Sequence, residues 1–408
     1  MRVLYLSRNF PNPLLPRLGL WADRLMRACM PPCQFKVISP IPYGPPLPGF
    51  VEYTRFRALA PSRWDEGVEV FHPRFLTAPG QWLHGVEDLS QYFAVVRVAD
   101  RIRRDFPFDL IHAHFTYPDG VVAARLAERY GVPLIISEHA LWRPWMEDYP
   151  RVRRRAVWAA RRAAFHLAAS RAARDSIAQF TGESARLRIV PNVLDEETFH
   201  LPDDGVRRDP HRLLFVGLIR RVKGVDVLLQ ALRRLIDRGR DVRLVVVGDS
   251  FYESYRREVE GLRALTADLK LSDRVEFLGG KPPTEIASEM RRSALLVLPS
   301  RRESFGAVLA EALACGTPVV ATDCGGPRDI VSDSVGTLVP PEDTDALAAG
   351  IERVLDRADS YDPARLRAFA LERFGSRRVA ALMVDLYHQA CDRAGRGADP
   401  APASLAVS

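Results

Sequence analysis

The feature that most constrains the fold is an alternation of short β-rich runs with helical stretches. In the first half, the runs lie at residues 3–7, 35–39, 68–71, 110–115, 134–137 and 187–191. Between them lie segments such as 120–130, whose apolar residues recur at helical spacing and which stops at Gly131, a natural helix cap. Strands and helices in this order predict a parallel sheet with right-handed crossovers.

The same alternation begins again after a polar segment at residues 201–210. Its runs lie at 212–219, 244–247, 275–278, 295–299, 319–322 and 336–339, with a helix expected over 225–238. The 408 residues also exceed the ~250–300 at which one hydrophobic core stops growing. We therefore predict an α/β protein with two Rossmann-like, doubly wound parallel-sheet domains.

The expected boundaries follow from this pattern. The first domain takes residues 1–200 and the second takes 211–375, with a surface loop over 41–56. A C-terminal helix at 376–393 could cross back to the first domain. The Ala-, Pro- and Gly-rich tail at 395–408 is expected to be disordered.

Composition excludes several classes of protein. With 47% hydrophobic and 27% charged residues, the chain resembles an ordinary folded protein. No apolar run approaches the ~18 residues of a membrane-spanning helix, and the N-terminus reads as a strand rather than a leader, so we expect a cytoplasmic protein. Five cysteines without paired ligand spacing indicate reduced thiols, and we expect no metal site and no cofactor.

The formal charge of +7 is not a nucleic-acid signature, because the basic residues are scattered. One cluster stands out, with six arginines at 151–155 and 161–162 around Val157 and Trp158. It has two interpretations that the sequence leaves open. It could rest on the anionic inner face of a membrane, or it could be a solvated helix face.

The stretch 295–322 carries the most chemical information, because it reads strand, loop, helix, turn and strand. Glu303 lies in the loop and Glu311 lies eight positions later in the helix. Gly306 permits close backbone approach, and the free amides at the helix start can hold a phosphate; these belong to Ala307, Val308 and Leu309. The pattern indicates a site for a diphosphate sugar, with carboxylates for the hydroxyls of the sugar and a ribose.

A second element, at residues 215–226, joins the first strand of the second domain to its helix. Gly217 allows backbone approach, while Lys223 and one of Arg220 or Arg221 can neutralise a departing diphosphate. In the first domain, two strands end in polar groups as an active-site rim would. These include His139, whereas His112 and His114 are expected to be structural.

The motifs Ser-x-x-Glu-Ser-Phe-Gly and Ala-Cys-Gly-Thr-Pro-Val-Val-Ala-Thr stand in register around Glu303 and Glu311. This arrangement resembles the glutamate pair of retaining GT-B glycosyltransferases, in the large family 4 type that includes sucrose synthase and many bacterial polysaccharide enzymes. The resemblance implies two domains that face a central cleft. It also implies a UDP- or GDP-linked sugar donor, retention by front-face attack without a metal ion, and an acceptor that is a glycan, a lipid-linked molecule or a small molecule.

The resemblance also assigns roles to residues. It implies that Glu303 contacts the donor sugar near its 3-hydroxyl, that Glu311 binds the ribose, and that His139 approaches the primary hydroxyl of the sugar. Further expected contacts come from Gly19 with the phosphates or acceptor, from Lys281 near the base, and from Ser304 and Phe305 within the motif. The chain departs from the family pattern at Leu218, where Arg or Asn often follows the glycine, and at Ala140, where glycine is usual.

Three rival functions remain for comparison. A nucleotide-sugar epimerase shares the architecture but consumes no acceptor. A pyridoxal-dependent phosphorylase would need a Schiff-base lysine, for which the four lysines offer no good candidate. A non-catalytic carbohydrate-binding scaffold would not need the glutamate pair together with Lys223.

Overall fold

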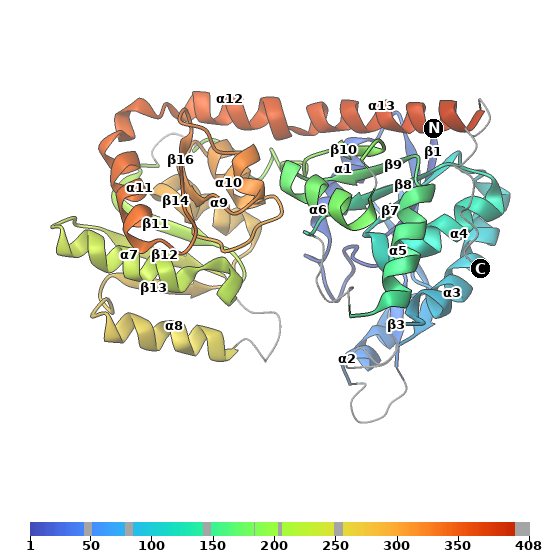
Figure 1. Ribbon diagram of the computed structural model, residues 1–408, viewed down its shortest axis with the longest axis horizontal. Coiled ribbons are helices and arrows are strands. Elements are labelled where there is room, and N and C mark those ends of the chain that lie inside the picture. Colours follow the sequence, from blue (N-terminus) through green and yellow to red (C-terminus); the bar gives the residue numbers. More distant parts are fainter. Residues whose placement is uncertain are drawn as a thin grey trace. The chain divides into compact units, whose positions relative to one another are not determined.

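The computed structural model describes residues 1–44, 51–77, 85–141, 148–182, 184–202, 206–248 and 256–395. Its contacts divide the chain into two compact units. The first contains Met1–Ala169, Ala173–Val190 and the residues from Val379 onward, and the second contains Ser170–Ala172 and Pro191–Arg378 (Figure 1). The chain thus leaves the first unit at Val190, earlier than the residue 200 expected from sequence. No helix of the described residues is long and apolar enough to cross a membrane.

The first unit is built on an eight-stranded sheet in the order β10-β9-β8-β7-β1-β2-β5-β4. The strands are β1 (Arg2–Leu6), β2 (Gln34–Ile38), β4 (Ser62–Asp65), β5 (Val68–Phe71), β7 (Leu110–His114), β8 (Leu134–Glu138), β9 (Phe165–Ala168) and β10 (Leu187–Ile189). All six predicted strands are present. The expectation of a purely parallel sheet was wrong at one edge, because a tight turn folds β4 back antiparallel onto β5.

The predicted loop at residues 41–56 is corrected at both of its ends, and its middle, residues 45–50, lies outside the described residues. β3 (Ile41–Tyr43) pairs with β6 (Arg74–Leu76) in a separate two-stranded sheet, and α2 (Val51–Thr54) and a 3-10 turn (Arg55–Ala58) follow. Pro42 is tolerated because β3 has only one neighbouring strand in that sheet, so an N–H on its other side is not needed.

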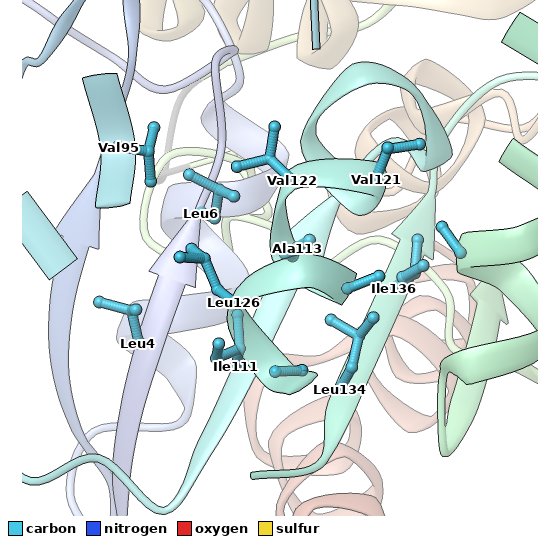
Figure 2. Close-up of a cluster of buried hydrophobic side chains, with 14 of the residues drawn as sticks. Leu4, Leu6, Val95, Ile111, Ala113, Val121, Val122, Leu126, Leu134 and Ile136 are labelled. Carbon is cyan, nitrogen blue, oxygen red and sulfur yellow. The ribbon is translucent and has the colours of Figure 1, made fainter. Parts of the chain in front are cut away.

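Helices cover the sheet of the first unit and complete its core. They are α1 (Leu20–Ala28), α3 (Glu87–Asp105), α4 (Val121–Tyr130), α5 (Pro150–Arg162), α6 (Arg171–Thr181) and the greater part of α13 (Ser376–Gly395). Figure 2 shows the contact between helices and sheet, where Val95 of α3 and Val122 and Leu126 of α4 lie over Leu6 and Ile111. α4 ends at Gly131, as the sequence predicts.

The second unit contains a wholly parallel six-stranded sheet in the order β13-β12-β11-β14-β15-β16. Its strands are β11 (Asp209–Val216), β12 (Arg243–Val247), β13 (Val275–Gly279), β14 (Ser293–Leu298), β15 (Val319–Thr322) and β16 (Gly336–Val339), and each overlaps a predicted run. The helices are α7 (Val225–Asp237), α8 (Arg256–Asp268), α9 (Pro283–Arg292), α10 (Ala307–Ala314), α11 (Thr344–Asp356) and α12 (Pro363–Phe374). The strand order reverses between β11 and β14, and the carboxyl ends of such strands are where open α/β sheets bind ligands.

The C-terminal helix α13 extends from Ser376 to Gly395. From Val379 onward its contacts are with the first unit, where the buried Tyr387 hydroxyl lies 2.7 Å from His112 Nδ1. Of the predicted disordered tail, only Gly395 is described, as the last residue of α13. The rest lies outside the described residues.

Candidate functional site

The switch point of the second unit brings together two residues that the sequence predicted separately. Lys223 lies in the turn after β11 and Glu303 lies in the loop after β14, and Lys223 Nζ donates a 2.5 Å hydrogen bond to Glu303 Oε2. Both side chains are mostly buried. A cation and a carboxylate in contact at this edge of the sheet could bind a ligand that carries both an anionic group and hydroxyl groups.

The Lys223 turn lies directly against the end of β14. Gly224 has a φ of 69°, and a Cβ atom there would lie 2.0 Å from the carbonyl oxygen of Pro299, so only glycine fits. The backbone N–H of Arg301 also donates to the carbonyl oxygen of Val222 at 2.8 Å. These contacts place Lys223 at a defined position beside Glu303.

The Arg301 side chain also links the loop after β14 to the Lys223 turn through hydrogen bonds. The sequence did not reveal this role. The Arg301 guanidinium forms hydrogen bonds of 2.9 and 2.8 Å with Asp226 and one of 2.6 Å with the carbonyl oxygen of Arg221. Burial alone would raise the pKa of Asp226, but the hydrogen bonds and charge of Arg301 hold that pKa below its usual value. Arg301 is therefore a positioning residue for the Lys223 turn.

The start of α10 lies beside Glu303, since a Cβ atom on Gly306 would lie 3.6 Å from Cγ of Glu303. Among the described residues no side chain caps the helix, which begins after Gly306. Ala307, Val308 and Glu311 are the residues of α10 that are not fully buried, and their spacing places them on one face. The amides of Ala307 and Val308 belong to the first turn, where helical N–H groups have no partner within the helix.

Two expected contacts at α10 need correction. The Leu309 amide is not available to a phosphate, because it donates to the carbonyl oxygen of Gly306 at 2.9 Å, and its side chain is fully buried. The Phe305 side chain is also buried and packs edge-to-face on Phe374, so only its backbone could approach a ligand. Ser304 is half-buried, and its carbonyl oxygen accepts a hydrogen bond from Ser170 Oγ at 2.5 Å.

The other predicted cations, Arg220, Arg221 and Lys281, have surroundings different from those of the Lys223–Glu303 pair. Arg220 and Arg221 are exposed and line a pocket of about 220 Å³ against α8, whose lining includes neither Lys223 nor Glu303. Lys281 follows the edge strand β13, where the hydrogen bond and charge of Glu285 raise its pKa. Gly217 directly follows β11, and its N–H donates to the carbonyl oxygen of Val247.

A loop that the sequence did not single out completes this region. After β15, the N–H of Gly326 donates to the carbonyl oxygen of Glu303 at 2.9 Å, and Gly325 forms a bridge with Glu303. Cys324 stands nearby. Burial chiefly raises the pKa of its thiol, and the Glu303 charge adds to this effect. The two adjacent glycines of this loop were the sequence signal that could have identified it.

In the first unit, His139 follows β8 and lies in a stack of rings. Its Nε2 is 2.8 Å from Nδ1 of His114, and its ring stacks on Trp21 with the centroids 3.7 Å apart. Trp21 comes from the start of α1, and His114 ends β7. The sequence motifs identified His139 but assigned no role to Trp21, which lies two residues after Gly19.

The buried position of His114 indicates which of its two ring nitrogens carries the proton. Burial, followed by the charges of His112 and His139, holds the pKa of His114 well below its usual value, so the ring is neutral and carries one proton. Its Nε2 is buried and has no hydrogen-bond partner among the described residues. Because a buried N–H without an acceptor is rare, we place the proton on Nδ1 of His114. His139 then accepts this hydrogen bond at Nε2.

Other polar groups at this edge of the first sheet hold the backbone in place. His112 bonds to Tyr387 and Ser137, and burial, with a smaller contribution from the charge of His139, lowers its pKa to about 3. Glu138 accepts hydrogen bonds from the N–H and the hydroxyl of Thr116. These contacts make His112 a structural residue, as predicted.

Gly19, the remaining predicted contact, lies at the start of α1. Its φ is 72°, and a Cβ atom would lie 1.8 Å from the carbonyl oxygen of Asn9. Only glycine fits there, because the chain before α1 passes directly over that carbonyl group. This packing accounts for Gly19 without a ligand, and its contact with phosphates or acceptor stays a prediction.

Two family models match adjoining parts of the chain. "Glycosyltransferase Family 4" matches residues 53–198 and "Glycosyl transferases group 1" matches residues 197–370. A protein named D-inositol 3-phosphate glycosyltransferase from Pseudarthrobacter chlorophenolicus is 34% identical over 74% of this chain and 76% of its own length. One of the same name from Paenarthrobacter aurescens is 30% identical over 84% of this chain and 93% of its own.

Solved structures share the fold at lower identity. HepE of Anabaena, solved in complex with UDP, superimposes with a TM-score of 0.72 and 22% identity, covering 95% of this chain and 100% of that chain. Sucrose-phosphate synthase of Thermosynechococcus elongatus gives a TM-score of 0.75 and 20% identity over 95% and 99% of the two chains. These likenesses show that the chain has the architecture of these enzymes.

Proposed function

This chain belongs to the family 4 type of glycosyltransferases, and we propose that it transfers a sugar from a UDP- or GDP-linked donor to an acceptor hydroxyl with retention of configuration. The observation that carries this proposal is the contact between Lys223 and Glu303 at the switch point of the second sheet. With the start of α10 beside them, these groups offer a cation, a carboxylate and free amides. A sugar diphosphate needs all three.

Each group takes part of the donor in this proposal. Lys223 and Arg221, or Arg220 in its place, neutralise the diphosphate as it leaves, and the amides of Ala307 and Val308 hold its oxygens. Glu303 accepts a hydrogen bond from a sugar hydroxyl. The structures of HepE with UDP and with UDP-glucose support a nucleotide-sugar donor for this chain.

The remaining contacts position the two ends of the donor. Glu311 accepts from the ribose hydroxyls, and Gly217, Ser304 and the Lys281 segment border the nucleotide. His139 approaches the primary hydroxyl of the sugar in this proposal, as the family resemblance implies.

In the proposed reaction, the bond between the anomeric carbon and the phosphate oxygen breaks while the acceptor oxygen attacks from the same face. The acceptor proton passes to the departing phosphate oxygen, so the products are a glycoside and a nucleoside diphosphate. A retaining glycosidase would instead place two carboxyl groups ~5–5.5 Å apart around the bond. Glu303 is bonded to Lys223, which favours a role in binding the donor. We propose that these cationic side chains take the place of a divalent metal.

The first experiment is a thermal-shift panel of nucleoside diphosphates and nucleotide sugars, with and without a chelator. A ligand at 100 times its dissociation constant should stabilise the chain by about 2.7 kcal/mol. Turnover is then followed by mass analysis and by NMR of the anomeric proton of the product. A changed nucleotide sugar with no acceptor consumed would identify an epimerase instead.

Variants at the pair test the roles of its members. Glu303→Gln and Lys223→Met should each lower turnover by about 100-fold or more, since each removes a charge that faces the donor. Arg302→Gln is the matched control, because Arg302 is the exposed neighbour of Glu303. Near-normal turnover by either pair variant would exclude the assigned roles.

The acceptor panel should begin with D-inositol 3-phosphate, because the relatives carry that name. Glycan and lipid-linked acceptors form its other arms. Hydrolysis of the donor with no transfer to any acceptor would leave the donor assignment intact and exclude the acceptors tested.

A further inference from the structure

Exposed apolar side chains gather at one place on the first unit. Six large apolar side chains are exposed among the described residues, and three of them surround Ser90 on α3. Val86 is 44% exposed and lies one turn before Ser90, and Phe93 is 61% exposed and lies nearly one turn after it. The N–H of Leu76, which is 60% exposed, donates to Ser90 Oγ at 2.8 Å. A local cluster of this kind marks an interaction surface more often than single scattered residues do.

Arginines continue the same side of α3. Arg97 and Arg101 follow Phe93 at intervals of four residues, so all three project from one face of the helix, and both arginines are exposed. The carboxylate between them, Asp100, is already bonded to Arg129 and Tyr130.

The outer face of α5 likewise combines exposed arginines with a large apolar side chain. This helix contains six arginines and no acidic residue. Arg151 and Arg154 are exposed, and Trp158 lies one turn further along on the same side, with the Arg162 guanidinium 4.3 Å from its ring. The opposite face is buried through Val152, Ala156, Ala159 and Ala160. Within the described residues, Arg97, Arg151 and Arg154 form no ion pair.

Hydrogen bonds join the two helices at this surface. Arg155 of α5 donates to the carbonyl oxygen of Gly85 at 2.9 Å, directly before Val86, and also to Asp88 of α3. Arg125 of α4 lies 3.3 Å from the same carboxylate and stands over the ring of Tyr92. Figure 1 shows α3, α4 and α5 beside one another in this unit. The apolar cluster and the arginines therefore belong to one surface.

We propose that this surface docks the protein on an anionic lipid bilayer. Arginine binds lipid phosphates through paired hydrogen bonds, the indole of Trp158 suits the boundary between head groups and acyl chains, and the Phe93 cluster can enter that boundary. This combination favours a bilayer over a nucleic acid, which would be contacted by the arginines but would leave the apolar cluster in water. The proposal goes beyond sugar transfer and does not depend on it.

Sedimentation of the full chain with vesicles tests the proposal. We expect binding to vesicles of phosphatidylcholine with phosphatidylglycerol, none to phosphatidylcholine alone, and weakening by salt. Arg97→Gln combined with Arg151→Gln and Arg154→Gln should lower the partition coefficient by about 100-fold, at about fivefold per arginine. Phe93→Ser should lower it further, by a factor that salt does not change.

A matched control removes the same charge elsewhere. Arg257→Gln, Arg292→Gln and Arg365→Gln together alter three exposed arginines of the second unit, and should leave vesicle binding unchanged. Circular dichroism and thermal unfolding verify that each variant is folded. Equal binding by both triple variants, no binding by the unmodified chain, or binding to RNA without binding to vesicles would each overturn the proposal. Donor binding measured without vesicles should be the same for both triple variants, so failure of this proposal is distinguishable from failure of the enzymatic one.

Discussion

Replacing Arg301 tests whether one side chain holds the Lys223 turn in place. Hydrogen bonds to charged groups contribute about 1.5–3 kcal/mol, and those to neutral groups about 1 kcal/mol. Arg301 forms two bonds with Asp226 and one with the carbonyl oxygen of Arg221. Because the Asp226 side chain is 34% exposed, we take the low end for that pair. Arg301→Gln should then loosen the turn by about 2–3 kcal/mol, or roughly 30- to 150-fold in its ordered population.

The assay is donor kinetics together with the affinity for the nucleoside diphosphate. KM for the donor should rise at least about tenfold in Arg301→Gln and in Asp226→Asn, and the two changes should not add in the double variant. Arg301→Lys should resemble Arg301→Gln, because lysine lacks the paired donors. Glu342→Gln is the control, since Glu342 is 65% exposed and accepts a hydrogen bond from Nε of Arg301, away from the Asp226 pair. Donor kinetics within about twofold of the unmodified chain in Arg301→Gln would refute the reasoning, and a lower melting temperature with unchanged KM would show a purely structural role.

Three further predictions concern packing and protonation. Gly224→Ala should destabilise the chain by at least about 2 kcal/mol in chemical denaturation, whereas Gly239→Ala, which has a similar φ but open space around it, should cost only about 1 kcal/mol; equal losses would contradict the clash. Burial lowers the pKa of His112 to about 3 and that of His166 to about 4, whereas an unfolded histidine has a pKa of ~6.5. Between these folded and unfolded pKa values, the unfolded chain therefore binds more protons than the folded chain. The free energy of unfolding should therefore fall from pH 7 to pH 5 by about 2 kcal/mol per histidine. His166→Gln should reduce this fall by about 2 kcal/mol, and an unchanged fall would contradict the prediction. His114→Asn places an amide N–H near the position of Nδ1 and should keep donor kinetics near normal, whereas His114→Leu should lower kcat/KM about fivefold; equal effects would argue against the proton arrangement.

The second unit could be predicted almost completely from the sequence. Its six strands are short apolar runs separated by helices with recognisable ends, because in a sheet covered on both faces each strand must be apolar throughout. Glu303 and Lys223 were found for a related reason. Each lies in the loop that follows such a strand, and the carboxyl ends of parallel strands meet at one edge of the sheet.

The first unit was predicted less completely. β9 was missed because its four residues, Phe165–Ala168, begin only three residues after α5 ends at Arg162, and no turn signal separates the two elements. β4 was missed because three of its four residues are polar and its one apolar residue, Trp64, is exposed at the edge of the sheet. Short edge elements depend on the neighbouring strand more than on their own composition.

The sequence by itself determined the two α/β units, the order of their elements and the loops that carry the candidate chemistry, because hydrophobic period and glycine position are local properties. Only the tertiary structure decided which of those side chains meet. It paired Lys223 with Glu303 across 80 residues and stacked Trp21 on His139. It also brought Arg301 within hydrogen-bond distance of Asp226, next to the Lys223 turn. Contacts between residues far apart in the chain depend on how strands are ordered and how closely loops approach, and no local pattern encodes either of these.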